Sequence, residues 1–86
     1  MAKHEYENVA INDDHTVATA MYRGLHVLFE EDEFFDDGFW YAEWNVTASR
    51  TSDFVTDKVA EHWYGDRDIA SVAEAFASYI NWMLDA

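Results

Sequence analysis

Hydrophobic and polar residues alternate with a period of two over much of the first half of the chain, which is the pattern of β-strands. The clearest case runs from Phe39 to Ala48, where Trp40, Ala42, Trp44 and Val46 share one face. A shorter alternation from Glu5 to Ile11 predicts an edge strand. Two clusters between these segments are typical of turns: Asn12-Asp13-Asp14 and Asp36-Asp37-Gly38.

Residues 15–30 are rich in Thr, Val and aromatic side chains, which favours a further strand from His15 to Glu30. Gly24 interrupts the pattern, so this strand is expected to bend or bulge there. The alternative is a helix, because Val17, Met21, Leu25 and Leu28 also fit helical spacing. The strand is preferred, since a glycine weakens the interior of a helix.

The period changes to that of helices after Arg50. Thr51 or Ser52 can cap a first helix that ends at Gly65. Its buried stripe would be Val55, Val59 and His62 or Trp63. A second helix begins at Ser71, which has capping-box spacing to Glu74, or slightly earlier with Asp68 as the cap. The stripe of this helix is Ile69, Val72, Phe76, Tyr79 or Ile80, and Met83.

These elements predict an α+β fold in a single domain, residues 1–86. A small antiparallel three-stranded sheet is followed by two C-terminal helices packed on one face, in the order β-β-β-α-α. Half of the residues are hydrophobic and 17% are aromatic, which argues against disorder despite the high charge. The expected core residues are Trp40, Trp44, Trp63, Phe76, Ile80 and Met83.

The chain is strongly acidic, with 18 Asp and Glu against 5 Lys and Arg and a formal net charge of −13. Six of the carboxylates fall within the eight residues from Glu30 to Asp37, and no basic residue lies between Arg23 and Arg50. Small soluble domains usually carry a net charge of about 2–8 in magnitude. The excess disfavours direct binding to nucleic acids or anionic membranes, which need a basic face, and favours a basic protein partner.

Catalytic and metal-binding motifs are missing from the sequence. The chain has no Cys, which excludes disulfides and thiolate zinc sites, and no motif organises its four histidines. We therefore expect no enzymatic activity, catalytic residue, metal or cofactor. Asp57 and Glu61 beside His62 could present metal ligands on one helix face, but a solvated helix side is the favoured interpretation. The acidic block lacks the ligand spacing of a calcium loop.

The start of the chain has no signal-peptide pattern, and no stretch approaches transmembrane length. These features predict a cytoplasmic location, which is the host-cell cytoplasm if the protein is phage-encoded.

The acidic block is the candidate partner-binding surface. Acids two residues apart on a strand point the same way, and their linear density is similar to that of phosphates on a DNA strand. Phe34 and Phe35 are either core residues that anchor the block or exposed interface residues. A second acidic edge on the helices could comprise Asp53, Asp57, Glu61, Asp66 and Asp68. The predicted partner-binding residues are Glu30, Glu31, Asp32, Glu33, Phe34, Phe35, Asp36, Asp37, Asp13, Asp14 and Glu43.

With its small size, its lack of Cys and this block of acids with interleaved aromatics, the chain resembles phage-encoded inhibitors of host defence: anti-CRISPR proteins and DNA-mimic antirestriction proteins. The resemblance lies in composition and in the three-strand, two-helix order, and it transfers no individual residue. It implies a monomeric or homodimeric inhibitor that fills the Lys/Arg-lined groove in which a CRISPR effector or restriction enzyme holds nucleic acid. The alternatives are an acidic domain adapted to high salt and a small assembly or interaction domain without nucleic-acid mimicry.

Overall fold

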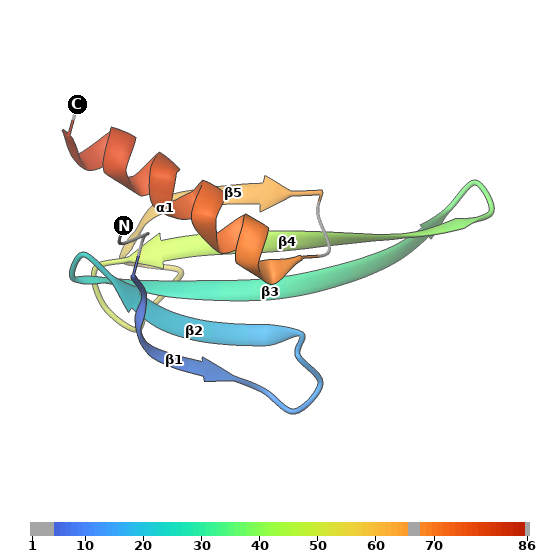
Figure 1. The fold of residues 1–86 in the computed structure, drawn as a ribbon, viewed down its shortest axis with the longest axis horizontal. Helices are drawn as coiled ribbons and strands as arrows, with labels where there is room; N and C mark the ends of the chain where they lie inside the picture. Colours follow the sequence, from blue (N-terminus) through green and yellow to red (C-terminus); the bar gives the residue numbers. More distant parts are fainter. Residues whose placement is uncertain (1–4, 66–67, 86) are drawn as a thin grey trace.

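The protein is a five-stranded antiparallel sheet with one helix across one of its faces (Figure 1). A computed structural model describes residues 5–65 and 68–85. The strands are neighbours in space in the order in which they follow in the chain. Their bounds are β1 (Glu7–Ile11), β2 (Val17–Tyr22), β3 (Leu25–Asp36), β4 (Phe39–Ser49) and β5 (Lys58–Tyr64), and the helix α1 spans Ile69–Asp85.

The predicted β-β-β-α-α order is wrong, first because residues 15–30 form two strands rather than one bent strand or a helix. Arg23 and Gly24 have φ angles of 51° and 82°. Two consecutive positive φ angles are typical of the type I′ turn, whose twist suits a two-residue hairpin. The chain therefore reverses at this point, and Tyr22 pairs with Leu25 across the turn. Gly24 marks a hairpin turn and not a bulge.

The predicted first helix is also wrong, because Lys58–Tyr64 is the edge strand β5 and residues 51–57 form a loop. The Asp53 carboxylate accepts the backbone N–H groups of Val55 and Thr56 at 3.0 and 2.9 Å, which closes a single turn. Val55, expected in a buried stripe, is 87% exposed. The following residues alternate between faces and pair with β4, so the period of two extends beyond Arg50.

The turn predicted at Asp36-Asp37-Gly38 is confirmed. Asp37 and Gly38 have φ angles of 52° and 86°, again the type I′ pattern, and they join β3 to β4. The turn predicted at Asn12-Asp13-Asp14 is confirmed as well. The Asn12 Oδ1 atom accepts the backbone N–H groups of Thr16 and Val17 at 2.8 and 3.0 Å and holds the connection between β1 and β2.

The C-terminal helix begins at Ile69, with Asp68 as its cap. The Asp68 carboxylate accepts the N–H of Ala70 at 3.1 Å and the hydroxyl of Ser71 at 3.0 Å, as an N-cap residue does. The predicted stripe is confirmed, because Val72, Phe76 and Ile80 are at most 1% exposed. They pack against the sheet face that carries Ala18, Val27, Phe29, Trp44, Val46 and Ala60.

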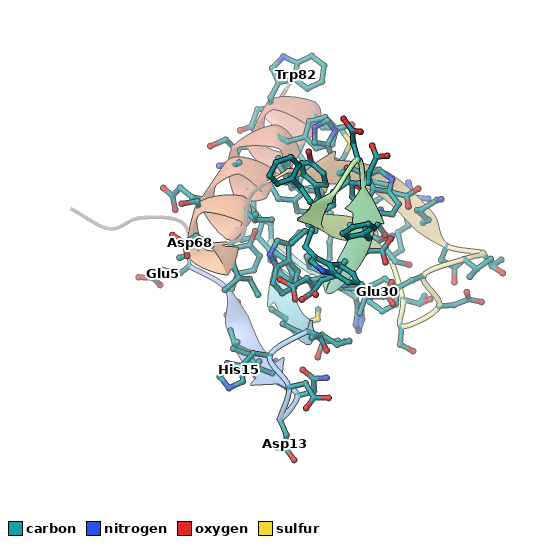
Figure 2. The ribbon with its side chains drawn as sticks, turned by 90° about the vertical axis from the view of Figure 1, so that its right-hand side faces the viewer. Glu5, Asp13, His15, Glu30, Asp68 and Trp82 are labelled. Atoms are coloured by element: carbon teal, nitrogen blue, oxygen red, sulfur yellow. The ribbon has the colours of Figure 1, made fainter. Side chains whose placement is uncertain are left out.

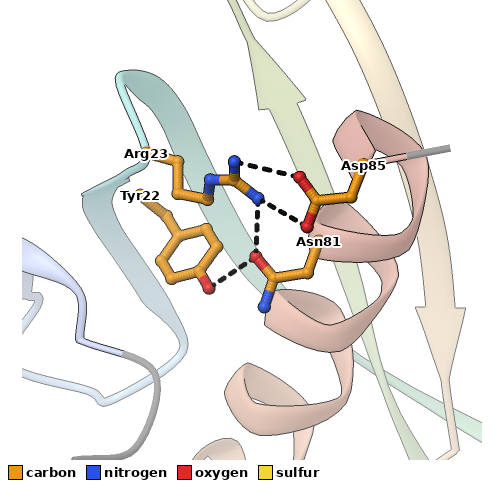
Figure 3. A network of polar contacts seen from close by, with 4 residues as sticks. All are labelled: Tyr22, Arg23, Asn81 and Asp85. Carbon is orange, nitrogen blue, oxygen red and sulfur yellow. Dashed lines mark hydrogen bonds and ion pairs between the residues drawn. The ribbon is translucent and has the colours of Figure 1, made fainter.

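Polar contacts fasten both ends of α1 to the sheet. Near its start, the Tyr6 hydroxyl donates to the carbonyl oxygen of Ala73 at 2.7 Å. Near its end, the Asn81 side-chain oxygen accepts from the Tyr22 hydroxyl and from Arg23, which also pairs with Asp85 (Figure 3). The helix is therefore held at the β2–β3 turn as well as by its apolar stripe.

Three of the six predicted core residues, Trp44, Phe76 and Ile80, are buried, and Met83 is partly buried. The predictions for Trp40 and Trp63 are wrong, because these residues are 64% and 51% exposed. Trp63 lies on the sheet face opposite α1, whereas Trp40 lies on the same side as Trp44 but beyond the end of the core.

The β3–β4 hairpin extends well beyond the rest of the sheet (Figure 1). The last β3 residue that pairs with β2 is Glu30, and the first β4 residue that pairs with β5 is Trp44. Residues 32–43 therefore pair only with each other, while Glu31 at their base pairs with Trp44 and donates its backbone N–H to the Thr16 carbonyl at 2.7 Å. We call residues 31–43 the arm. The arm extends along the longest axis of the molecule, which measures 42 × 33 × 27 Å.

Candidate functional site

The arm has an unusual composition for a segment outside the core. Every residue from 31 to 43 is acidic or aromatic except Gly38 and Ala42. All residues from 32 to 41 are exposed. Strand pairing with an unbroken register from His26–Ser49 to Asp36–Phe39 holds the arm together, since no other element covers it. The acidic block thus lies on a hairpin, with residues 30–36 in strand β3 and Asp37 at the turn.

The carboxylates of the arm are divided between its two faces. Glu31 and Glu33 lie on the face that continues the helix-covered side of the sheet, since they pair with Trp44 and Ala42. Asp32 and Asp36 lie on the opposite face, and Glu43 joins them as the direct partner of Asp32. The single row of anions expected from the sequence is therefore two shorter rows, one on each face.

The number of charges per length still matches a nucleic-acid strand. Residues 30–37 extend about 24 Å at about 3.4 Å per residue. Seven carboxylates fall within that length: Glu30, Glu31, Asp32, Glu33, Asp36, Asp37 and Glu43. One negative charge per about 3.4 Å equals the phosphate density of one DNA strand.

These carboxylates have no cationic partner among the described residues. The ion pairs recorded there join Arg23 to Asp85 and Lys58 to Glu61. Arg23, Arg50 and Lys58, the described basic residues, all lie at the end of the sheet opposite the arm, because they adjoin the β2–β3 turn or the β4–β5 connection. Lys3 and Arg67 lie outside the described residues. Within residues 5–65 and 68–85, acids at that end of the sheet thus lie beside cations, whereas the carboxylates of the arm do not.

Like charges on the arm also face each other directly. Asp32 and Glu43 are cross-strand partners, and a pair of like charges directly opposite each other destabilises a sheet. Two carboxylates in this position do not serve the stability of the hairpin.

Five aromatic side chains are exposed on the same arm. Phe34 stacks against Tyr41 across the strands, with ring centres 5.4 Å apart and an angle of 21° between the planes. On the other face, Phe35 contacts Trp40 edge-on at 5.3 Å and 61°. These four residues and Phe39 next to the turn are 39–66% exposed. Large apolar side chains gathered on a surface in this way usually mark an interaction site.

Phe34 and Phe35 are therefore exposed, so the core role that the sequence left open for them is wrong. The set of predicted partner-binding residues omits Phe39, Trp40 and Tyr41, although the sequence contains a signal for them. Counting outward from the Asp37–Gly38 turn places Trp40 opposite Phe35 and Tyr41 opposite Phe34, as the structure has them. The hairpin register thus places Trp40 and Tyr41 of β4 beside the acidic block of β3.

The other predicted site residues lie apart from the arm. Asp13 and Asp14 are exposed on the β1–β2 turn, at the end of the sheet from which the arm extends. Figure 2, which looks onto the arm, shows Asp13 at the edge of the molecule and well away from Glu30. These two acids add to the negative potential of that end of the molecule without lengthening either row.

The second acidic edge proposed for the helices is not a single surface. Asp53 and Asp57 lie in the β4–β5 loop, Glu61 lies on β5, and Asp66 falls outside the described residues. Asp57 accepts the Thr51 hydroxyl at 2.6 Å. Lys58, 2.8 Å from Glu61, and then the Asn45 amide lower the pKa of the Glu61 carboxyl. These acids are engaged locally.

A metal site, a membrane-spanning helix and a pocket are the other features of the described residues that could indicate a function. No group of three or more His, Asp or Glu side chains there is placed to hold a metal ion. None of the described helical residues form a helix with the length and hydropathy needed to cross a membrane. A half-open apolar cavity of about 150 Å³ lies where β1 and β2 meet the start of α1. Its lining includes Val9, Ile11, Phe29 and Ile69, and it lacks the converging polar groups of a catalytic pocket.

Among the described residues, the arm is thus the strongest candidate for a binding surface, because it combines exposed aromatic rings with carboxylates that have no described cationic partner. No protein-family model matches this chain, and neither a curated protein nor a solved structure is significantly similar to it.

Proposed function

We propose that this protein is a non-enzymatic binding protein whose arm occupies the basic, nucleic-acid-binding groove of another protein. The observation that carries the proposal is the arm itself: a projecting hairpin with six carboxylates, counting Asp37 at its turn, and no cationic partner among the described residues. Its charge spacing suits a groove lined by Lys and Arg that otherwise binds phosphates. We further propose that the partner is a basic protein of a host defence system, such as a CRISPR effector or a restriction enzyme.

The charge distribution supports fast, oriented association. The carboxylates of the arm have no neighbouring described cations, so their negative potential can steer a basic partner toward the arm, and steering of this kind raises association rates by roughly 10–10³-fold at low salt. Since screening at about 0.1 M salt acts beyond about 10 Å, the effect weakens as salt is added. Exposed aromatic residues on the arm would then slow dissociation, as buried aromatic anchors do in other interfaces.

Composition and shape support the nucleic-acid mimic over the two alternatives. A domain that is acidic only for solvation in high salt has no need of a projecting hairpin on which five exposed aromatic residues lie among the acids. An assembly domain would be expected to bury its aromatic surface against a second copy, which seven nearby carboxylates of the same sign oppose. Because the β-β-β-α-α order is wrong, the architecture no longer supports the resemblance to anti-CRISPR proteins. The acidic composition remains as support for a host-defence partner.

The test compares two variants of equal net charge. Asp32→Lys with Asp36→Lys changes the arm, and Glu5→Lys with Glu7→Lys changes exposed acids outside the arm. Each double change raises the formal net charge from −13 by four, to −9. The immobilised proteins are exposed to host lysate, retained proteins are eluted with salt and identified by mass spectrometry, and the captured protein is mixed with its labelled nucleic acid.

The expected result has two parts. Wild type and the Glu5/Glu7 variant capture a basic protein and displace its nucleic acid, whereas the Asp32/Asp36 variant does neither. A fourfold lysine variant at Glu31, Asp32, Glu33 and Asp36 should lose capture completely and keep its circular dichroism spectrum. Capture that survives in this fold-intact variant, or a captured protein that binds nucleic acid and the wild type at the same time, would overturn the proposal.

A further inference from the structure

We propose that the aromatic pairs of the arm make it a receptor for arginine rather than lysine side chains of its partner. This inference rests on the proposed function and goes beyond it, since charge alone does not distinguish the two cations. The feature that carries it is the placement of exposed ring faces among carboxylates on both sides of one hairpin.

The face of the arm away from α1 presents rings flanked by carboxylates. Phe34 lies between Asp32 and Asp36 along β3, each about 6.8 Å away at two residues of strand rise. Tyr41 stacks on Phe34 from β4, and Glu43 lies two residues from Tyr41. A flat cation placed on the exposed surface of this pair would therefore have carboxylates on both sides of the ring pair along the strands.

The opposite face repeats the arrangement with a larger ring. Phe35 and Trp40 are cross-strand partners, and Glu33 lies two residues from Phe35 on the same face. Trp40 is 64% and Phe35 is 59% exposed, so both rings keep accessible surface. Tryptophan is the ring that attracts cations most strongly. Each face of the arm thus offers the same pair of groups, an aromatic surface and an adjacent carboxylate.

Arginine fits this combination better than lysine does. Its guanidinium group is planar, stacks on aromatic rings and binds a carboxylate with two parallel N–H donors, whereas the lysine ammonium is compact and strongly hydrated. A cation–π contact at an exposed site strengthens binding by a factor of roughly 2–5. Because the strongly hydrated lysine ammonium gains less from such a contact, and because each face has one aromatic pair, we expect a preference for arginine of about fivefold in a peptide that engages both faces.

Charge complementarity selects a cationic partner over the other occupants of an aromatic surface. An apolar partner would have to bury the arm's carboxylates without counter-charges, and removing even one unpaired charge from water is costly. Nucleic-acid bases can stack on such rings, but their phosphates would be repelled by the same acids. A basic partner segment rich in arginine can both stack on the rings and pair with the carboxylates.

The experiment measures the dissociation constants of two labelled nine-residue peptides, one of arginine and one of lysine, by fluorescence anisotropy at about 0.1 M salt, where screening weakens contacts beyond about 10 Å. Wild type is compared with a variant in which Phe34, Phe35, Trp40 and Tyr41 are replaced by leucine. The control is Trp82→Leu, which removes a 69% exposed ring that stacks on Tyr79 in α1, away from the arm. Circular dichroism verifies the fold of each variant.

We expect wild type and Trp82→Leu to bind the arginine peptide about fivefold more tightly, and the arm variant to bind both peptides equally. Equal affinities in wild type, or an equal loss for both peptides in the arm variant, would overturn the arginine preference and leave the proposed function standing. If neither peptide binds the wild type, or if the Asp32/Asp36 lysine variant binds both peptides unchanged, the proposed function fails and the arginine preference fails with it.

Discussion

Trp40 and Trp44 offer a matched test of whether the arm contributes to the stability of the fold or only the body does, where the body means the helix α1 and the sheet outside residues 31–43. Both lie on the same face of β4, four residues apart, and both were expected in the core. Trp44 is 2% exposed and Trp40 is 64% exposed. The proposed perturbation is alanine at each position in turn. If the body alone stabilises the fold, these two chemically identical substitutions should have very different effects on the free energy of unfolding.

The expected difference follows from the buried areas. The exposed fractions differ by 62% of the residue surface, 64% minus 2%. A tryptophan buries up to about 250 Å², so Trp44 buries roughly 155 Å² more than Trp40. At about 25 cal/mol per Å², this area corresponds to about 4 kcal/mol. Trp44→Ala should therefore cost roughly 3–5 kcal/mol, the usual range for such a change in a core. Trp40→Ala should cost at most about 1 kcal/mol, the contribution of its cross-strand pair with Phe35.

Urea unfolding followed by circular dichroism measures both changes, because urea is uncharged and does not screen the carboxylates. A domain of this size has a total stability of roughly 4–13 kcal/mol, so Trp44→Ala could abolish folding. Phenylalanine at both positions gives a milder pair that keeps the comparison measurable. The reasoning is refuted if the Trp40 variants lose as much stability as the Trp44 variants, since the arm would then be part of the core.

Three further predictions concern the body and its charges. Tyr6→Phe should lower the free energy of unfolding by about 1 kcal/mol in urea titration, because the hydroxyl that donates to the Ala73 carbonyl is lost; an unchanged value would mean that this bond does not fasten β1 to α1. Backbone N–H groups of Thr56 and Val55 lower the pKa of the Asp53 carboxyl below its ordinary value of 3.8. Its stabilising effect is therefore present above the unfolded-state pKa and lost as the pH falls through the folded-state pKa, so Asp53→Ala should destabilise the protein at neutral pH and progressively less in strong acid. A loss of equal size at both pH values would contradict this. Finally, thermal melting should show a folded protein at low salt whose melting temperature rises modestly as salt screens the arm, whereas a protein that is unfolded without multimolar salt would favour the salt-adapted alternative.

The sequence predicted local features better than it predicted the fold. Asp37 and Gly38 form a turn in which both residues need positive φ, a requirement that Asp-Gly signals strongly, and this turn was predicted correctly. Arg23-Gly24 has the same geometry, but arginine gives no such signal, so one hairpin was interpreted as a bent strand. The strand β5 was missed because Val55, Val59 and His62 happen to fit helical spacing, while pairing with β4 is a long-range property.

The candidate site was predicted in part. The acids of β3 are evident from their density in the sequence. That no described cation pairs with those of the arm depends on the tertiary structure, which places Arg23, Arg50 and Lys58 at the other end of the sheet. Exposure of Trp40 could not be predicted from β4 alone, because the alternation that buries Trp44 continues unchanged through Trp40. The difference arises because the other strands and α1 end before the arm begins, which depends on how long each neighbouring element is.

The most direct test of the central claim, that the arm is the surface that binds a basic partner, is an amide chemical-shift titration of the ¹⁵N-labelled protein with the nine-arginine peptide. Shift changes should concentrate in residues 30–43, and those of β1, β5 and α1 should stay small. Shift changes spread evenly over the acidic surface, or concentrated on α1 or the β4–β5 loop, would contradict it.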